Sequence, residues 1–175
     1  KADGIAVVST KDHKVVKVLA AGSDPEQFAI SADGRRLFVA NEDIAQVTVV
    51  DADSGAHIAR IPVGREPEGI GISPDGRWVL VTNESDSSVS VIDTATLKAT
   101  KTVPVGKRPR DMAFAPDGNT AYVSGEMDAS LYSMSVTGNE PVRRLLQLRE
   151  AARPMAVVHD SARNRLYLST GRGGT

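Results

Sequence analysis

The stretch PEGIGISPDGRWVLVTN, residues 67–83, decides the fold of this chain. Two short apolar runs, 68–72 and 78–82, flank a Ser-Pro-Asp-Gly turn, in which proline fixes φ and glycine accepts a positive φ. Two more short runs rich in β-branched residues follow at 89–92 and 99–103, separated by polar turn residues. Each run is too short for a helix. The stretch and its continuation therefore predict four short strands joined by tight turns.

The same pattern returns every 42 residues along the chain. Its marks are a glycine, a proline that opens the first strand, an Asp-Gly pair in the first turn and a glutamate after the second strand. They lie at Gly22, Gly64 and Gly106; Pro25, Pro67 and Pro109; Asp33, Asp75 and Asp117; and Glu42, Glu84 and Glu126. A fourth, degenerate copy starts near Pro154. Because about 40–45 residues in four strands make one propeller blade, we predict an all-β fold of four-stranded antiparallel β-propeller blades.

The phase of the repeat predicts how the blades divide the chain. We expect a half-blade at 1–22, whole blades at about 23–64, 65–106 and 107–150, and a second half-blade at 151–175. A seven-bladed ring would need about 290 residues at this repeat, so we expect the chain to be part of one. Two alternatives stay open. The half-blades could close a four-bladed ring, or two molecules could pair through open blade edges into an eight-bladed ring if the chain is complete.

Composition excludes several functional classes. The net charge is −1, which gives no electrostatic reason to expect nucleic acid as a partner. No apolar run approaches the roughly 20 residues that span a bilayer, so we expect no membrane insertion. The chain has no cysteine, which excludes disulfides, thiol nucleophiles, thiolate-bound metals and covalent attachment of c-type heme.

The second strand of each repeat carries a family resemblance. Residues 38–41, 80–83 and 122–125 read FVAN, LVTN and YVSG, with a Pro-Asp-Gly turn before and Val-Ser-Val-Ile-Asp after the second copy. The chain therefore resembles the YVTN-type β-propeller repeat family. Residues 24–29 and 66–70 are similar to the subgroup associated with pyrroloquinoline quinone-dependent alcohol catabolism. The resemblance implies a bacterial, exported, periplasmic protein, commonly seven-bladed and without established catalytic residues.

The recurring polar residues predict a charged rim on one face of the propeller. The connection before the first strand and the loop between the second and third strands of a blade share that face. We therefore expect these candidate ligand or partner residues to gather there: Glu26, Glu42, Glu68, Glu84, Arg110 and Glu126. Asp43 and Asp86 lie close by in sequence. The glutamates have two competing interpretations, as caps of strand ends or as a binding surface, and Ca²⁺ coordination is a third, minor one.

No catalytic constellation accompanies this rim. His13, His57 and His159 do not share the 42-residue phase and lack metal-ligand spacing. We therefore predict no catalytic residues, no cofactor and no bound metal. The leading hypothesis is a non-enzymatic binding or scaffold module that binds a protein or small-molecule ligand, as a periplasmic accessory to quinoprotein-dependent oxidation. The alternatives are a metal-dependent, lactonase-like propeller hydrolase and a structural cell-surface repeat protein.

Overall fold

The computed structural model describes residues 4–149 and 151–171, and in these ranges the chain is all-β. Three sheets have four antiparallel strands each, which confirms the predicted fold class. Blade 1 consists of β3 (Pro25–Ile30), β4 (Arg36–Asn41), β5 (Gln46–Asp51) and β6 (His57–Pro62). Blade 2 consists of β7 (Pro67–Ile72), β8 (Trp78–Asn83), β9 (Ser88–Asp93) and β10 (Lys98–Pro104). Blade 3 consists of β11 (Pro109–Phe114), β12 (Thr120–Gly125), β13 (Ser130–Ser135) and β14 (Arg143–Gln147).

Two-stranded sheets flank the three blades. One pairs β1 (Gly4–Val8) with β2 (Val15–Ala20), and the other pairs β15 (Arg153–Asp160) with β16 (Arg165–Gly171). The outer ends of the two predicted half-blades, at residues 1–3 and 172–175, and the predicted end of the third blade at residue 150 lie outside the described residues. Within the described ranges, no helix is long and apolar enough to cross a bilayer.

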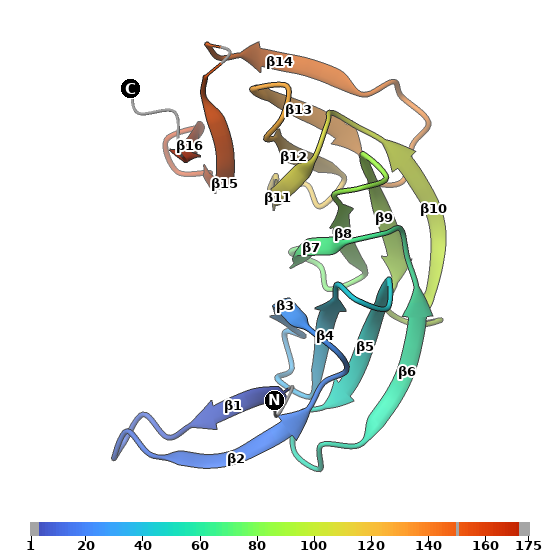
Figure 1. Ribbon diagram of the computed structural model, residues 1–175, viewed down its shortest axis with the longest axis vertical. Helices are drawn as coiled ribbons and strands as arrows, with labels where there is room; N and C mark the ends of the chain where they lie inside the picture. The colour runs from blue at the N-terminus through green and yellow to red at the C-terminus, as the bar shows by residue number, and fades with distance from the viewer. Residues whose placement is uncertain (1–3, 150, 172–175) are drawn as a thin grey trace.

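The blades form an arc with their first strands on the concave side (Figure 1). β3, β7, β11 and β15 follow one another along that side, and the fourth strands of the blades form the convex edge. Small residues let the inner strands approach closely. A Cβ on Gly69 would collide with the backbone oxygen of Arg110 and would lie 2.9 Å from Cα of Asp111 in the next blade. The concave side is therefore the crowded axis of a propeller.

The hydrophobic core lies between neighbouring sheets and is filled by their middle strands. Phe38, Val49 and Val81 belong to the cluster between blades 1 and 2, and Leu80 and Val123 belong to the cluster between blades 2 and 3. These side chains are completely buried. Both faces of the middle strands pack on a neighbour, and this explains why the first four residues of β8 form a continuous apolar run. Blade stacking thus stabilises sheets that would be marginal alone.

Turn chemistry fixes where each strand ends. The Asp-Gly turn of blade 2 has φ +73° at Gly76, a conformation that glycine adopts without steric cost. Asp75 accepts hydrogen bonds from the Ser73 hydroxyl (2.5 Å) and from the backbone N–H of Arg77 (3.1 Å). These bonds hold the pKa of Asp75 below its ordinary value. The aspartates of these turns therefore have a structural role.

Candidate functional site: the charged rim

One face of the arc carries the loops that enter the inner strands and the loops between the second and third strands; we call it the rim face. In blade 1, the N–H of Glu42 donates to the carbonyl of Asp24 (3.1 Å). In blade 2, the N–H of Glu84 donates to the carbonyl of Glu66 (2.9 Å). In blade 3, the backbone N–H of Glu126 donates to the carbonyl of Arg108 (3.0 Å). These repeated bonds bring the two predicted groups of rim residues to the same face.

The residue before each inner-strand proline has an unusual backbone conformation. Asp24, Glu66 and Arg108 have φ values of +48°, +52° and +51°. Such left-handed conformations are costly for residues with a Cβ and persist where the surrounding structure enforces them. Beyond this residue each inner strand has a register shift, between Pro67 and Ile70 in blade 2. The turn and the bulge together direct the charged side chains of this segment to the rim.

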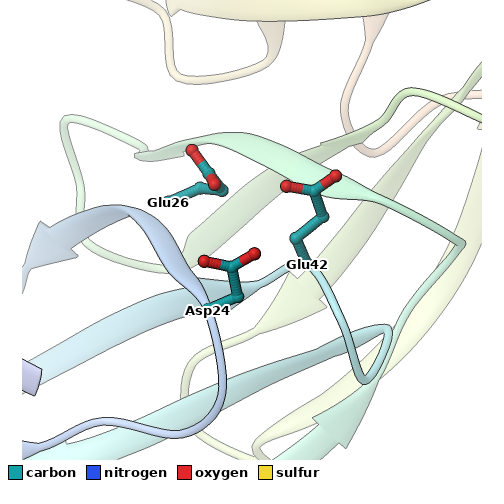
Figure 2. Close-up of side chains that lie close together, drawn as sticks. All are labelled: Asp24, Glu26 and Glu42. Carbon is teal, nitrogen blue, oxygen red and sulfur yellow. The ribbon is translucent and has the colours of Figure 1, made fainter. Parts of the chain in front are cut away.

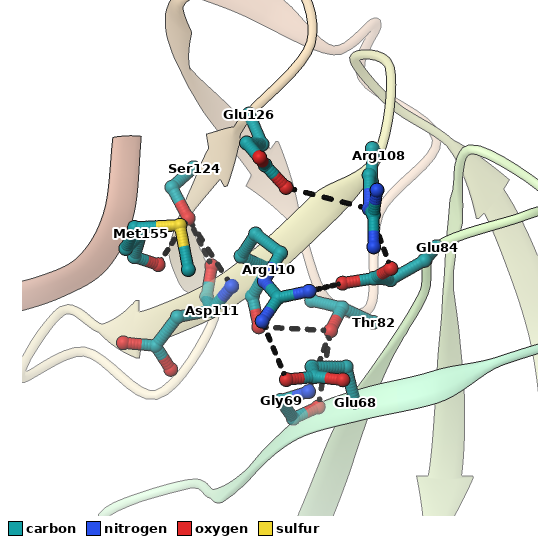
Figure 3. Close-up of polar contacts among 10 residues, drawn as sticks. All are labelled: Glu68, Gly69, Thr82, Glu84, Arg108, Arg110, Asp111, Ser124, Glu126 and Met155. Atoms are coloured by element: carbon teal, nitrogen blue, oxygen red, sulfur yellow. Dashed lines mark hydrogen bonds and ion pairs between the residues drawn. The ribbon is translucent and has the colours of Figure 1, made fainter. Parts of the chain in front are cut away.

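Arg110 joins blade 2 to blade 3 on the rim face (Figure 3). It lies at the start of β11, and its guanidinium forms ion pairs with Glu68 (2.9 Å) and with Glu84, both from blade 2. The side chains of all three residues are mostly buried. A planar guanidinium with several N–H donors suits this bridging position, because it satisfies two carboxylates at once.

Arg108 extends the same network towards blade 3 (Figure 3). Its Nε lies 2.7 Å from Oε2 of Glu84 and 3.3 Å from Oε2 of Glu126. Glu84 therefore pairs with two arginines, and its side chain is only 3% exposed, whereas that of Arg108 is 47% exposed. Sequence reasoning missed Arg108 as a rim residue. The signal was its position one residue before the repeat proline, at the mouth of the inner strand.

The carboxyl group of Glu68 has a strongly shifted pKa. Burial raises this pKa to about 7, and repulsion from Glu84, Glu26 and Glu42 adds to the rise while Arg110 opposes it. Burial disfavours the charged form of a carboxyl group. The guanidinium of Arg110, which Glu68 shares with Glu84, does not offset that cost. Glu68 is thus the rim group whose protonation changes near neutral pH.

Asp24, Glu26 and Glu42 form a second cluster at the mouth of blade 1, which we call the acidic notch (Figure 2). Each offers a carboxylate oxygen, and these oxygens all lie within 4.8 Å of one another. Burial raises the pKa of Glu42, and its contact with Glu26 and the charges of Asp24 and Glu66 raise it further. Among the residues that the structure describes, these three carboxylates lie close enough together to hold a cation.

Hydroxyl groups on the second strands fix the spacing of the inner strands below the rim. Oγ1 of Thr82 accepts a bond from the N–H of Gly69 in its own blade (2.8 Å) and donates to the carbonyl of Arg110 in the next (3.3 Å). Ser124, one repeat later, accepts from the N–H of Asp111 (3.1 Å) and donates to the carbonyl of Met155 (2.9 Å). These hydroxyls hold the arginine-bearing strand at a fixed distance from its neighbours.

The six predicted rim residues thus fall into two groups. The structure brings Glu68, Glu84, Arg110 and Glu126 into one ion-pair network that also contains Arg108. Glu26 and Glu42 lie in the acidic notch, with Asp24. The first group has the geometry of an inter-blade connection, and the second has the geometry of a cation-attracting surface.

Comparison with known proteins adds a family and two structural relatives. A model of the cytochrome D1 heme domain matches residues 1–152. Hydrazine synthase from Kuenenia stuttgartiensis is 26% identical with a TM-score of 0.67, over 85% of this chain and 49% of that chain. Dihydro-heme d1 dehydrogenase NirN, in complex with DHE, is 18% identical with a TM-score of 0.75, over 97% of this chain and 38% of that chain. The chain therefore spans about half or less of these relatives' length. A search of curated proteins gives no match.

Proposed function

This chain belongs to the cytochrome D1 heme domain family, and from that premise we propose that it is a β-propeller binding module whose rim face engages a positively charged partner. The observation that carries the proposal is the acidic notch, where Asp24, Glu26 and Glu42 converge. Clustered carboxylates that raise one another's pKa attract cations.

The charge of the whole rim supports this proposal. Carboxylates outnumber cationic side chains in the loops of the rim face. The carboxylates are Asp24, Glu26, Glu42, Asp43, Glu66, Glu68, Glu84, Asp86, Glu126 and Asp128; the cationic groups are Arg65, Lys107, Arg108, Arg110, Arg149 and Arg153. Arg65, Arg108 and Arg110 already pair with carboxylates of this face. The excess negative charge is concentrated at blade 1.

The family name implies a heme, and the histidines of the described part of the chain do not lie on the rim face. Heme iron takes an axial His, Cys, Met or Tyr ligand. His13 and His57 lie on the side of the blades opposite the rim, where a ring nitrogen of His57 is 2.9 Å from the carbonyl of Ala20. His159 packs against Tyr122, with ring centroids 5.4 Å apart. The rim carboxylates would also repel the carboxylates of a heme.

The cellular location and the accessory role that the sequence predicted are part of this proposal. We propose an exported, periplasmic location, supported by the resemblance to exported propellers and by the family match. The accessory role in quinoprotein-dependent oxidation rests on the similarity of 24–29 and 66–70 alone. The family match instead favours an association with heme-linked redox proteins, because the matched model is that of a heme domain.

Hydrogen-exchange footprinting with a defined cationic probe tests the proposed function. A peptide of alternating arginine and glycine should protect the backbone at 42–45, 84–87 and 126–129, the rim loops, and added salt should weaken that protection. A matched glutamate–glycine peptide should protect none of them. Protection confined to the turns of the opposite face, or equal effects of the two peptides, would show that the proposal is wrong.

A further inference from the structure

Three hollows follow one another along the rim face, at three successive junctions between sheets. Their volumes are about 330 Å³ between blades 1 and 2, about 510 Å³ between blades 2 and 3, and about 430 Å³ between blade 3 and β15. Glu66 and Ser85 line both the first and the second hollow, and Arg108 and Met127 line both the second and the third. Because neighbouring hollows share walls, they form one continuous depression, which we call the rim groove.

The repeat builds the walls of the rim groove in the same way at each junction. One wall is the loop between the second and third strands of a blade, and the other is the entry to the next inner strand. Ala45, Ser87 and Ala129, which end the three loops, have φ values of +49°, +49° and +50°. The carbonyl of Ser87 accepts a bond from the N–H of Val105 (2.9 Å), and equivalent bonds hold the other two loops. The backbone of the groove is therefore repeated, and its junctions differ in their side chains.

The charge of the lining changes sign along the rim groove. The first hollow has three carboxylates and one arginine, the second has two carboxylates and two cationic groups, and the third has Glu126 with Arg108 and Arg153. The residue directly before each inner-strand proline contributes to this change, because it is Glu66 at the first junction and an arginine at the next two. Glu42 belongs both to the first hollow and to the acidic notch. The groove is thus acidic beside blade 1 and basic beside β15.

The basic end of the groove has N–H donors that the described chain leaves free for a ligand. Both ion pairs of Arg108 run through Nε, and within residues 4–149 and 151–171 its Nη groups have no hydrogen-bond partner (Figure 3). Nη1 of Arg153 lies 2.9 Å from Sδ of Met127, and a thioether is a weak acceptor. The Met127 side chain is 52% exposed between these arginines. The third hollow therefore offers two guanidinium groups and an apolar contact.

We propose that the rim groove binds an extended segment of a partner protein in one orientation, with basic side chains over blades 1 and 2 and an acidic side chain in the third hollow. The proposal names the chemistry of the partner at the rim face and so rests on the proposed function. A carboxylate fits the third hollow, because guanidinium groups bind it through paired, charge-assisted hydrogen bonds. The reversed orientation would place like charges together at both ends, and that repulsion selects one orientation.

Two synthetic peptides of the same composition test this proposal by NMR of the isotope-labelled chain. In the segregated peptide an arginine–glycine half is joined to an aspartate–glycine half, in both chain directions; in the other peptide, arginine and aspartate alternate. The segregated peptide should bind more tightly in at least one direction. A nitroxide label on its arginine end should broaden the amide signals of 42–45, and a label on its aspartate end should broaden those of 126–129.

The variant Arg153→Glu tests the basic end alone. It should weaken binding of the segregated peptide by about tenfold, because an attraction becomes a repulsion, while the arginine–glycine peptide binds no more weakly than before. Arg163→Glu is the matched control. It makes the same change of charge in the exposed turn between β15 and β16, on the opposite face, and should leave the binding of both peptides unchanged.

Three results would overturn the proposal: equal affinities for the segregated and alternating peptides, equal broadening of both loops from either labelled end, or undiminished binding of the segregated peptide by Arg153→Glu. If the arginine–glycine peptide still protects the rim loops in these cases, the proposed function stands and only the oriented binding in the groove is wrong. If neither peptide reaches the rim loops, both fail.

Discussion

Glu84 is the side chain on which the contacts between blades 2 and 3 converge. It recurs with Glu42 and Glu126 at the repeat interval, yet its surroundings differ from theirs, because two arginines reach it from the next blade. A buried carboxylate with two cationic partners is a structural group, and removing its charge leaves those partners poorly satisfied.

Glu84→Gln should lower the free energy of unfolding by about 1.5–3 kcal/mol, the range for hydrogen bonds that involve a charged group. Urea denaturation at neutral pH measures it. Asp86→Asn is the control, because its ion pair with the exposed Arg65 lies at the surface and should contribute about 0–1 kcal/mol. Equal effects of the two substitutions would show that the inter-blade network does not stabilise the fold.

Glu68 should make stability depend on pH near neutrality. Its folded-state pKa of about 7 lies above the ordinary value of 4.5, so between these values the folded chain holds a proton that the unfolded chain has lost. The unfolding free energy contributed by this group therefore falls as pH rises from about 4.5 to about 7. Glu68→Gln should flatten that part of the stability–pH curve, measured by urea denaturation; an unchanged curve would contradict the raised pKa.

The inner strand is the element that positions the rim. The repeat signalled the proline that opens it, and the structure adds the bulge that follows and the close approach at Gly69. The repeat did not signal the left-handed residue before the proline, because the residue types of Asp24, Glu66 and Arg108 do not indicate a positive φ. The repeat therefore predicts the strand and its face, while the direction of its first charged side chain depends on the packed backbone.

Gly69→Ala should destabilise the chain more than Gly71→Ala, although both lie in β7. The added methyl group at residue 69 meets the backbone of Arg110 and Asp111, which cannot move without shifting blade 3. At residue 71 it meets the sulfur of Met112 at 2.9 Å, the flexible end of a side chain. Overpacking of about 1–3 kcal/mol is expected for the first and less for the second. Chemical denaturation that ranks them in the opposite order would contradict the proposed blade spacing.

At the scale of the whole molecule, the flanking sheets expose apolar side chains. Val158 of β15 is 60% exposed and Tyr167 of β16 is 53% exposed. Exposed apolar faces beside unpaired strand edges favour association. Pairing through open blade edges if the chain is complete thus stays a prediction, and so does the number of blades in the ring.

The double variant Val158→Lys/Tyr167→Lys should reduce concentration-dependent association of this chain, measured by sedimentation velocity. Charged residues on an exposed edge disfavour edge-to-edge pairing. A chain that is monomeric at every concentration before the substitutions would show that these faces do not associate.

The sequence predicted the site less completely than the fold. Four marks sharing one period are enough to specify blades, strand order and the face on which Glu26, Glu42, Glu68, Glu84, Arg110 and Glu126 lie. Their division into an ion-pair network and an acidic notch depends on contacts between blades. The presence of Glu66 and Glu68 at the repeat positions of Arg108 and Arg110 decides it, and the meaning of these exchanges appears only when adjacent blades are seen packed together.

Binding of cations by the rim face through the acidic notch is tested by the affinity of the arginine–glycine peptide, measured by titration calorimetry. The wild-type chain should bind it, with affinity falling as salt rises, and Glu26→Gln/Glu42→Gln should bind it about tenfold more weakly. Equal affinity of the two chains, or affinity that does not change with salt, would contradict the account.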